Sequence, residues 1–143
     1  MERKIKHLEF IQDIIKRMAG NSFLLRGWSI TLVSALVTLF VSVTDTKLKP
    51  YLILIALGLL MIFWLLDAYY LSQERAYRKL YEVVRKKPEA DIDFSLNAKE
   101  YLRGNNSWAS SMLSNVFLVF YGSATIILLL IASNLFGINI YIK

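Results

Sequence analysis

The stretch PYLILIALGLLMIFWLL at residues 50–66 decides the fold of this chain of 143 residues. It is seventeen residues long, carries no charge, and lacks the polar face that a helix on the surface of a soluble protein keeps. A helix rises 1.5 Å per residue, so the run nearly crosses a hydrocarbon core of about 30 Å. The uncharged residues 68–73 beyond Asp67 extend it. We therefore predict a transmembrane helix over residues 50–73.

Two further stretches have the same character. Residues 27–44 form an uncharged run of eighteen, and residues 104–142 carry no charge around an apolar centre at 112–136. The first run begins more than 25 residues into the chain, behind a charged segment, which argues against a cleaved signal peptide. We predict an all-α integral membrane protein with a single membrane domain over residues 1–143. Its other spans are expected at residues 24–44 and 107–136, with a short tail at residues 137–143.

The composition excludes several kinds of chemistry. Hydrophobic residues make up 56% of the chain, which has one His and no Cys. The absence of Cys excludes disulfides, thiolate metal sites and Cys nucleophiles, and a single His excludes a His-rich metal site. The sequence contains no G-x-S-x-G or H-E-x-x-H motif and no pair of carboxylates within a span. We expect no enzyme activity, no catalytic residue, no metal and no cofactor.

Lysine and arginine predict the orientation. Six lie in residues 1–26, up to the start of the uncharged run of the first span, eight lie between the second and third spans, and three lie elsewhere. Three spans place the first two groups on one side of the membrane, and cytoplasmic segments carry the excess of Lys and Arg. We therefore expect a protein of the bacterial inner (cytoplasmic) membrane, with the N-terminus cytoplasmic and the C-terminus outside.

The first twenty residues have the pattern of an amphipathic helix. Ile5, Leu8, Ile11 and Ile15 recur at helical spacing among charged residues. Gly20 is a predicted helix stop, and Asn21 or Ser22 a predicted N-cap of the first span. Two interpretations stay open: the helix lies in the inner leaflet against anionic lipid headgroups, or it packs on other cytoplasmic helices.

Residues 74–106 are predicted to be a cytoplasmic helical segment. Residues 67–87 contain no Gly or Pro, so the second span is expected to continue as one helix that ends before Pro88. Asn97 followed by Glu100 resembles a capping box and predicts a short helix over residues 98–103. Residues 104–107 form a turn that caps the third span.

Two sets of small polar residues mark the spans. Thr31, Ser34, Thr38 and Ser42 share one face of the first span, and the third span carries Ser111, Asn115 and Thr125. Such residues are typical of close helix packing. Polar residues that line an oligomeric pore have the same periodicity, so both interpretations stay open.

Arg26 and Asp67 lie at the predicted cytoplasmic ends of the first two spans, at similar depth. Charges near the hydrocarbon boundary pair with one another or reach toward water. We predict a structural ion pair that fixes two helices; a role in ion or proton passage and simple snorkelling are the alternatives.

A basic cluster follows the second span. Its candidate ligand-binding residues are Arg75, Arg78, Lys79, Arg85 and Lys86. Glu74–Arg78 and Glu82–Lys86 are predicted i,i+4 ion pairs. The cluster is explained by orientation alone, yet it could also bind anionic lipid, a nucleotide or an oligonucleotide. We expect no duplex nucleic acid as a partner.

Three segments resemble a family of small bacterial inner-membrane proteins. They are KIKHLEFIQ at residues 4–12, RMAGNSFLLRGW at residues 17–28 and FWLLDAYYLSQERAYRKLY at residues 63–81. They resemble the membrane partner of nucleotidyltransferase-based anti-phage systems of the Hailong type. The resemblance implies an oligomeric channel controlled by a nucleic-acid-like signal, such as a nucleotidyltransferase product, on the cytoplasmic face. It carries over no individual site residue.

The expected function is an oligomeric ion channel or membrane-depolarising effector of the inner membrane, gated from the cytoplasm by a nucleotide-like or protein signal in anti-phage defence. Three short spans cannot enclose a pore, so we expect a homo-oligomeric bundle. A non-conducting membrane anchor or assembly partner for a cytoplasmic enzyme is the alternative. A transporter is disfavoured because no span carries a charge at mid-depth.

Overall fold

The computed structural model describes residues 1–135, and these residues form helices and turns with no strand. The principal helices are α1 (Glu2–Ser42), α2 (Lys49–Lys86), α3 (Trp108–Met112) and α4 (Asn115–Leu135). Three 3₁₀ turns, η1 (Glu89–Asp91), η2 (Lys99–Tyr101) and η3 (Gly104–Asn106), lie between α2 and α3. The predicted all-α class is confirmed for this part of the chain.

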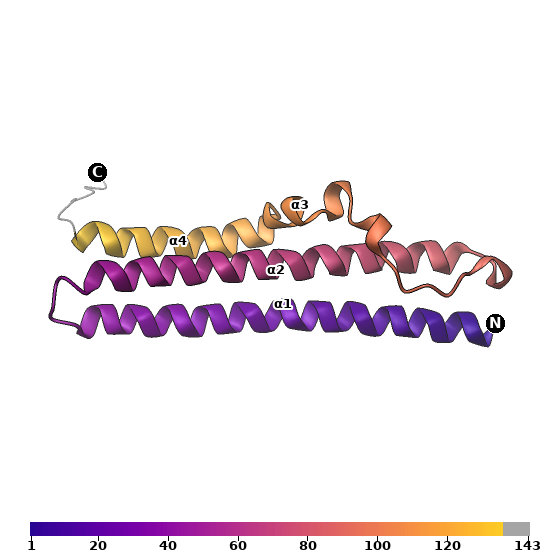
Figure 1. The fold of residues 1–143 in the computed structure, drawn as a ribbon, viewed down its shortest axis with the longest axis horizontal. Coiled ribbons are helices and arrows are strands. Elements are labelled where there is room, and N and C mark those ends of the chain that lie inside the picture. Colours follow the sequence, from indigo (N-terminus) through magenta and orange to yellow (C-terminus); the bar gives the residue numbers. More distant parts are fainter. Residues whose placement is uncertain (136–143) are drawn as a thin grey trace.

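Helices α1 and α2 form a long antiparallel hairpin closed by residues 43–48, and α4 lies along the part of α2 nearest that loop (Figure 1). Three helices, α1, α2 and α4, are long and apolar enough to cross a membrane. We call residues 27–66 together with α4 the spanning half. Residues 1–25 and 68–107 are the charged half, which contains the N-terminus and the three 3₁₀ turns.

Helix α1 passes through Gly20 without a break, so the predicted stop at Gly20 is wrong. A glycine inside a helix costs about 1 kcal/mol relative to alanine. Contacts with α2 on both sides of Gly20 offset this: Ile11 is completely buried, and Ser22 is buried beside Asp67. The N-terminal segment therefore packs on another helix, and the alternative of a separate helix lying in the membrane interface is wrong.

The charged half has its own apolar core. Ile11 packs with Ala76, Leu80 and Val84 of α2, and two residues of the following connector, Ile92 and Ala98, complete the cluster. Lys4 closes the end of α2, because its Nζ donates to the carbonyl oxygens of Arg85 at 2.9 Å and Lys87 at 2.7 Å. Helix α2 runs unbroken through Asp67 and ends before Pro88, as predicted.

The third predicted span, residues 107–136, is interrupted. Ser107 caps α3 by accepting a hydrogen bond from the Ser110 N–H, and the chain then turns at residues 113–114 before α4 begins. The turn is held by α2, since Trp64 Nε1 donates to the Met112 carbonyl oxygen at 3.1 Å. The predicted tail at residues 137–143 lies outside the described residues.

The predicted short helix over residues 98–103 is only the 3₁₀ turn η2. Asn97 Oδ1 accepts a hydrogen bond from the Lys99 N–H at 3.1 Å, two residues ahead. This local turn takes the place of the predicted capping box with Glu100.

Candidate functional site

A buried polar cluster joins α1, α2 and α4. We use this name for Ser22, Arg26, Asp67 and Tyr121. Asp67 is completely buried, and its Oδ2 lies 2.8 Å from Arg26 Nε and 3.1 Å from the Tyr121 hydroxyl. Ser22 Oγ donates to Asp67 Oδ1 and accepts from Arg26 Nη2 at 2.9 Å. Each member therefore has a partner within the cluster, as a buried charge requires.

Aromatic rings enclose this polar cluster. The Tyr121 ring is fully buried and lies parallel to Trp64, with 5.8 Å between ring centroids. The guanidinium carbon of Arg26 lies 5.1 Å from the centroid of Phe117, a distance suited to a cation–π contact. The rings exclude water from one side of the ion pair, which strengthens its electrostatic attraction.

The polar cluster sits where the spanning half meets the charged half. Asp67 directly follows the uncharged residues 50–66, and Arg26 directly precedes the uncharged residues 27–44. The structure brings together the two residues of the predicted ion pair. Ser22 was missed in this role although it lies four residues before Arg26 on the same helix face; Tyr121 has no sequence signal, because only the tertiary fold brings α4 to Asp67.

We expect Tyr121→Phe to destabilise the fold by about 1 kcal/mol, because it removes one hydrogen bond to Asp67 and keeps the ring. The measurement is the free energy of unfolding in detergent micelles, followed by circular dichroism. Tyr51→Phe is the matched control, since Tyr51 is exposed at the start of α2. Equal stability of the two variants would show that the hydroxyl contributes nothing to the cluster.

The hydroxyl stripe of α1 is our name for Thr31, Ser34, Thr38 and Ser42. All four are exposed. Val33, Leu36 and Val37 of the same helix instead pack against the buried apolar cluster that α2 and α4 form. Three of the hydroxyls donate to backbone carbonyls of α1: Thr31 at 3.0 Å, Thr38 at 2.9 Å and Ser42 at 2.8 Å. The stripe thus lies on a face of α1 that the other helices of the chain leave exposed, and Ser34 at its edge also lines the groove between α1 and α4.

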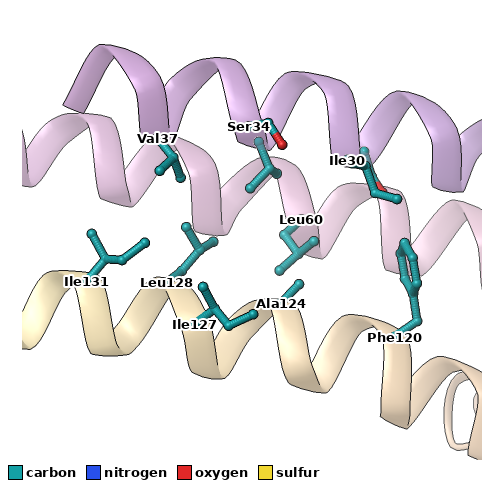
Figure 2. Close-up of a pocket in the computed structure, with 11 residues that line it drawn as sticks. Ile30, Ser34, Val37, Leu60, Phe120, Ala124, Ile127, Leu128 and Ile131 are labelled. Atoms are coloured by element: carbon teal, nitrogen blue, oxygen red, sulfur yellow. The ribbon is translucent and has the colours of Figure 1, made fainter. Parts of the chain in front are cut away.

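An open groove separates α1 from α4 in the spanning half. Figure 2 shows Ile30 and Val37 of α1 opposite Phe120 and Ile127 of α4, with Leu60 of α2 between them. The groove has a volume of about 350 Å³, and apolar side chains line most of it. It therefore offers no path for ions through a single copy of the chain.

The predicted polar residues of the third span do not form one stripe, because the break at residues 113–114 separates them. Ser111 is buried in α3, and its Oγ accepts a hydrogen bond from Arg75 Nη1 at 3.5 Å. Asn115 is exposed at the start of α4. Thr125 donates to the Tyr121 carbonyl at 2.8 Å, within α4. The three residues therefore lie in different surroundings and do not share one helix face.

The residues of the basic cluster also have different surroundings. Arg78 and Arg85 pair with Glu74 and Glu82 at 2.7 Å, so the predicted pairing of Glu82 with Lys86 is wrong. Lys79 and Lys86 are exposed, and neither forms an ion pair with any residue from 1 to 135. Arg75 turns toward residues 105–111, where its Nη1 donates to the Asn105 carbonyl at 3.0 Å. A ligand that binds this face would have to compete with the two glutamates for Arg78 and Arg85, two of the five cations.

Comparisons of the chain with protein-family models, curated proteins and solved structures find no match.

Proposed function

We propose that the protein is a homo-oligomeric ion channel or membrane-depolarising effector of the bacterial inner membrane. The observation that carries this proposal is the exposed hydroxyl stripe of α1. An exposed row of hydroxyls on a spanning helix is better accommodated against water or a neighbouring helix than against lipid. Arranging copies around a symmetry axis would bring one stripe from each copy to a common centre.

The proposed pore lies between copies rather than within one. Within residues 1–135, the groove that the three long helices enclose is lined mostly by apolar side chains and offers no polar conduit through a single chain. Identical soluble subunits usually assemble with closed point-group symmetry, and cyclic symmetry of this kind would suit a short membrane bundle. Oligomerisation is therefore part of the proposal, and a chain that stays monomeric in a bilayer would exclude it.

The proposed gating mechanism depends on the continuity of α1 and α2. Both helices pass from the charged half into the spanning half without a break, and the polar cluster locks them together at the boundary. A signal that moves the charged half would thus move the spanning helices. Such a signal changes the current only if it binds the open and closed states unequally.

The proposed signal is a nucleotide, an oligonucleotide or a protein on the cytoplasmic face. Lys79 and Lys86 are exposed cations of α2 that a phosphate-rich ligand could approach. The proposal that a nucleotidyltransferase makes this ligand, as part of anti-phage defence, is supported by the sequence resemblance of residues 4–12, 17–28 and 63–81.

A non-conducting membrane anchor for a cytoplasmic enzyme is the second candidate. It is favoured by the hydrogen bonds from Thr31, Thr38 and Ser42 to the backbone of α1, which satisfy these donors without water. Under this alternative the hydroxyl stripe packs against a neighbouring helix, and the oligomer carries no current.

The proposed orientation predicts which positions an impermeant reagent reaches. The chain has no Cys, so Thr46→Cys and Ala90→Cys each introduce a single thiol, at an exposed position on opposite ends of the hairpin. In intact cells a membrane-impermeant maleimide should label the variant at 46 and spare the variant at 90 until the membrane is opened. Labelling of position 90 alone in intact cells would show that the orientation is the opposite of the one proposed.

Removing hydroxyls from the stripe tests the pore directly. The double variant Thr31→Val/Thr38→Val keeps side-chain shape and should lower the unitary conductance roughly twofold or more, because an apolar ring hinders hydration of the pore. Thr125→Val is the matched control, since this hydroxyl also donates to its own helix but lies outside the stripe. Unchanged conductance in the double variant would show that the hydroxyl stripe does not line the pore.

A further inference from the structure

We propose that the chain binds a phosphate group in a pocket beside the polar cluster, independently of whether it conducts ions. The pocket has a volume of about 750 Å³ and lies between α1, α2 and the junction of α3 with α4. No acidic residue lines it. Its polar lining includes Arg26, Arg75, Asn105, Ser110, Ser114 and Asn115.

Two guanidinium groups give the pocket its charge. Arg75 forms no ion pair with any carboxylate in residues 1–135, and it donates only through Nη1, to the Asn105 carbonyl and Ser111 Oγ. Arg26 pairs with Asp67 through Nε, and its Nη1 has no hydrogen-bond partner in the same part of the chain. The pair of arginines therefore offers free N–H donors that suit the planar, bidentate recognition of a phosphate.

The start of α4 adds to this preference for an anion. The first N–H groups of a helix lack partners within the helix and carry a partial positive charge. Ser114 directly precedes α4, and its Oγ is buried without a hydrogen-bond partner among the described residues. A phosphate oxygen in the pocket would supply the missing partner.

The depth of the pocket indicates which phosphates can reach it. Its walls include Arg26, where the uncharged run of α1 begins, and Arg75, which lies eight residues beyond Asp67 in the charged half. A phosphate in a lipid headgroup and a phosphate on a water-soluble small molecule can both reach that level. The shared ligand chemistry is a phosphate ester held by two arginines.

The test uses the whole protein, purified in a maltoside detergent that contains no phosphate. Two soluble probes, inorganic phosphate and glycerol 3-phosphate, are titrated at constant ionic strength, and the midpoint of thermal unfolding is followed. The lipid probe compares phosphatidylcholine nanodiscs with and without phosphatidic acid. A ligand that binds only the folded chain raises this midpoint.

Binding should weaken roughly tenfold in Arg75→Gln, which removes charge-assisted hydrogen bonds. Lys99→Gln removes the same charge from an exposed position in η2 outside the pocket, and it should bind like the wild type. Ser114→Ala keeps both guanidinium groups, and it carries the test if Arg75→Gln does not fold. It should weaken binding by a smaller factor.

A response to the soluble probes that depends on Arg75 or Ser114 supports a site for free phosphorylated molecules. A response to phosphatidic acid alone, with the same dependence, supports a lipid-headgroup site. The proposal is overturned if no probe stabilises the wild type, or if the pocket variants respond like Lys99→Gln.

Discussion

Asp67→Ala is expected to destabilise the folded chain by about 3 kcal/mol, because it leaves the charge of Arg26 without its partner in a largely buried site. The same change removes the acceptor for the hydroxyls of Ser22 and Tyr121. The Arg26 side chain is 29% exposed and can reach water in part, which places the value at the lower end for a broken buried pair.

The measurement is the free energy of unfolding in micelles of mixed detergents, with Asp13→Ala as the matched control. Asp13 is exposed, and its Oδ1 lies 3.8 Å from Lys16 Nζ. Removal of the Asp13 carboxylate should therefore cost less than about 0.5 kcal/mol of stability. The double variant Arg26→Ala/Asp67→Ala should recover part of the loss. Strictly additive losses, or equal stability of Asp67→Ala and Asp13→Ala, would contradict the polar cluster.

Ser72→Pro is expected to cost about 3 kcal/mol and to disconnect the charged half from the spanning half. Ser72 is buried on α2, five residues beyond Asp67. Proline removes the hydrogen bond to the carbonyl four residues earlier, and its ring clashes with that carbonyl, so the helix kinks. Current through the proposed channel should persist while its response to a cytoplasmic signal is lost.

Ser72→Ala is the control for this variant. It removes only the hydrogen bond from Ser72 Oγ to the Tyr69 carbonyl, at 2.7 Å, and keeps the helix. Its stability and its response should remain close to those of the wild type. A proline variant that responds like the alanine variant would show that the continuity of α2 does not transmit the signal.

Several features of the fold could be predicted because their cause lies in neighbouring residues. The absence of charge over residues 50–66 indicates a spanning helix, and the absence of Gly and Pro over residues 67–87 predicts that α2 continues beyond it. The pairing of Arg26 with Asp67 followed from their similar depth at the ends of two uncharged runs.

Other features depend on contacts between distant segments. Gly20 looks like a helix stop until Ile11 and Ser22 are seen packed on α2. The break before α4 depends on Trp64, whose indole binds the Met112 carbonyl released there. The proposed phosphate pocket combines Arg26 with Arg75, which are far apart in the sequence, so the run of basic residues after the second span pointed only to Arg75.

The most direct test of the proposed channel is the ionic current across a planar lipid bilayer that contains the purified wild-type protein. We predict discrete steps of current that appear with the protein and are absent when empty detergent micelles are added. A protein that is folded and inserted in the bilayer, yet gives no current above this control with or without cytoplasmic extract, would contradict the channel and leave the membrane anchor as the better account.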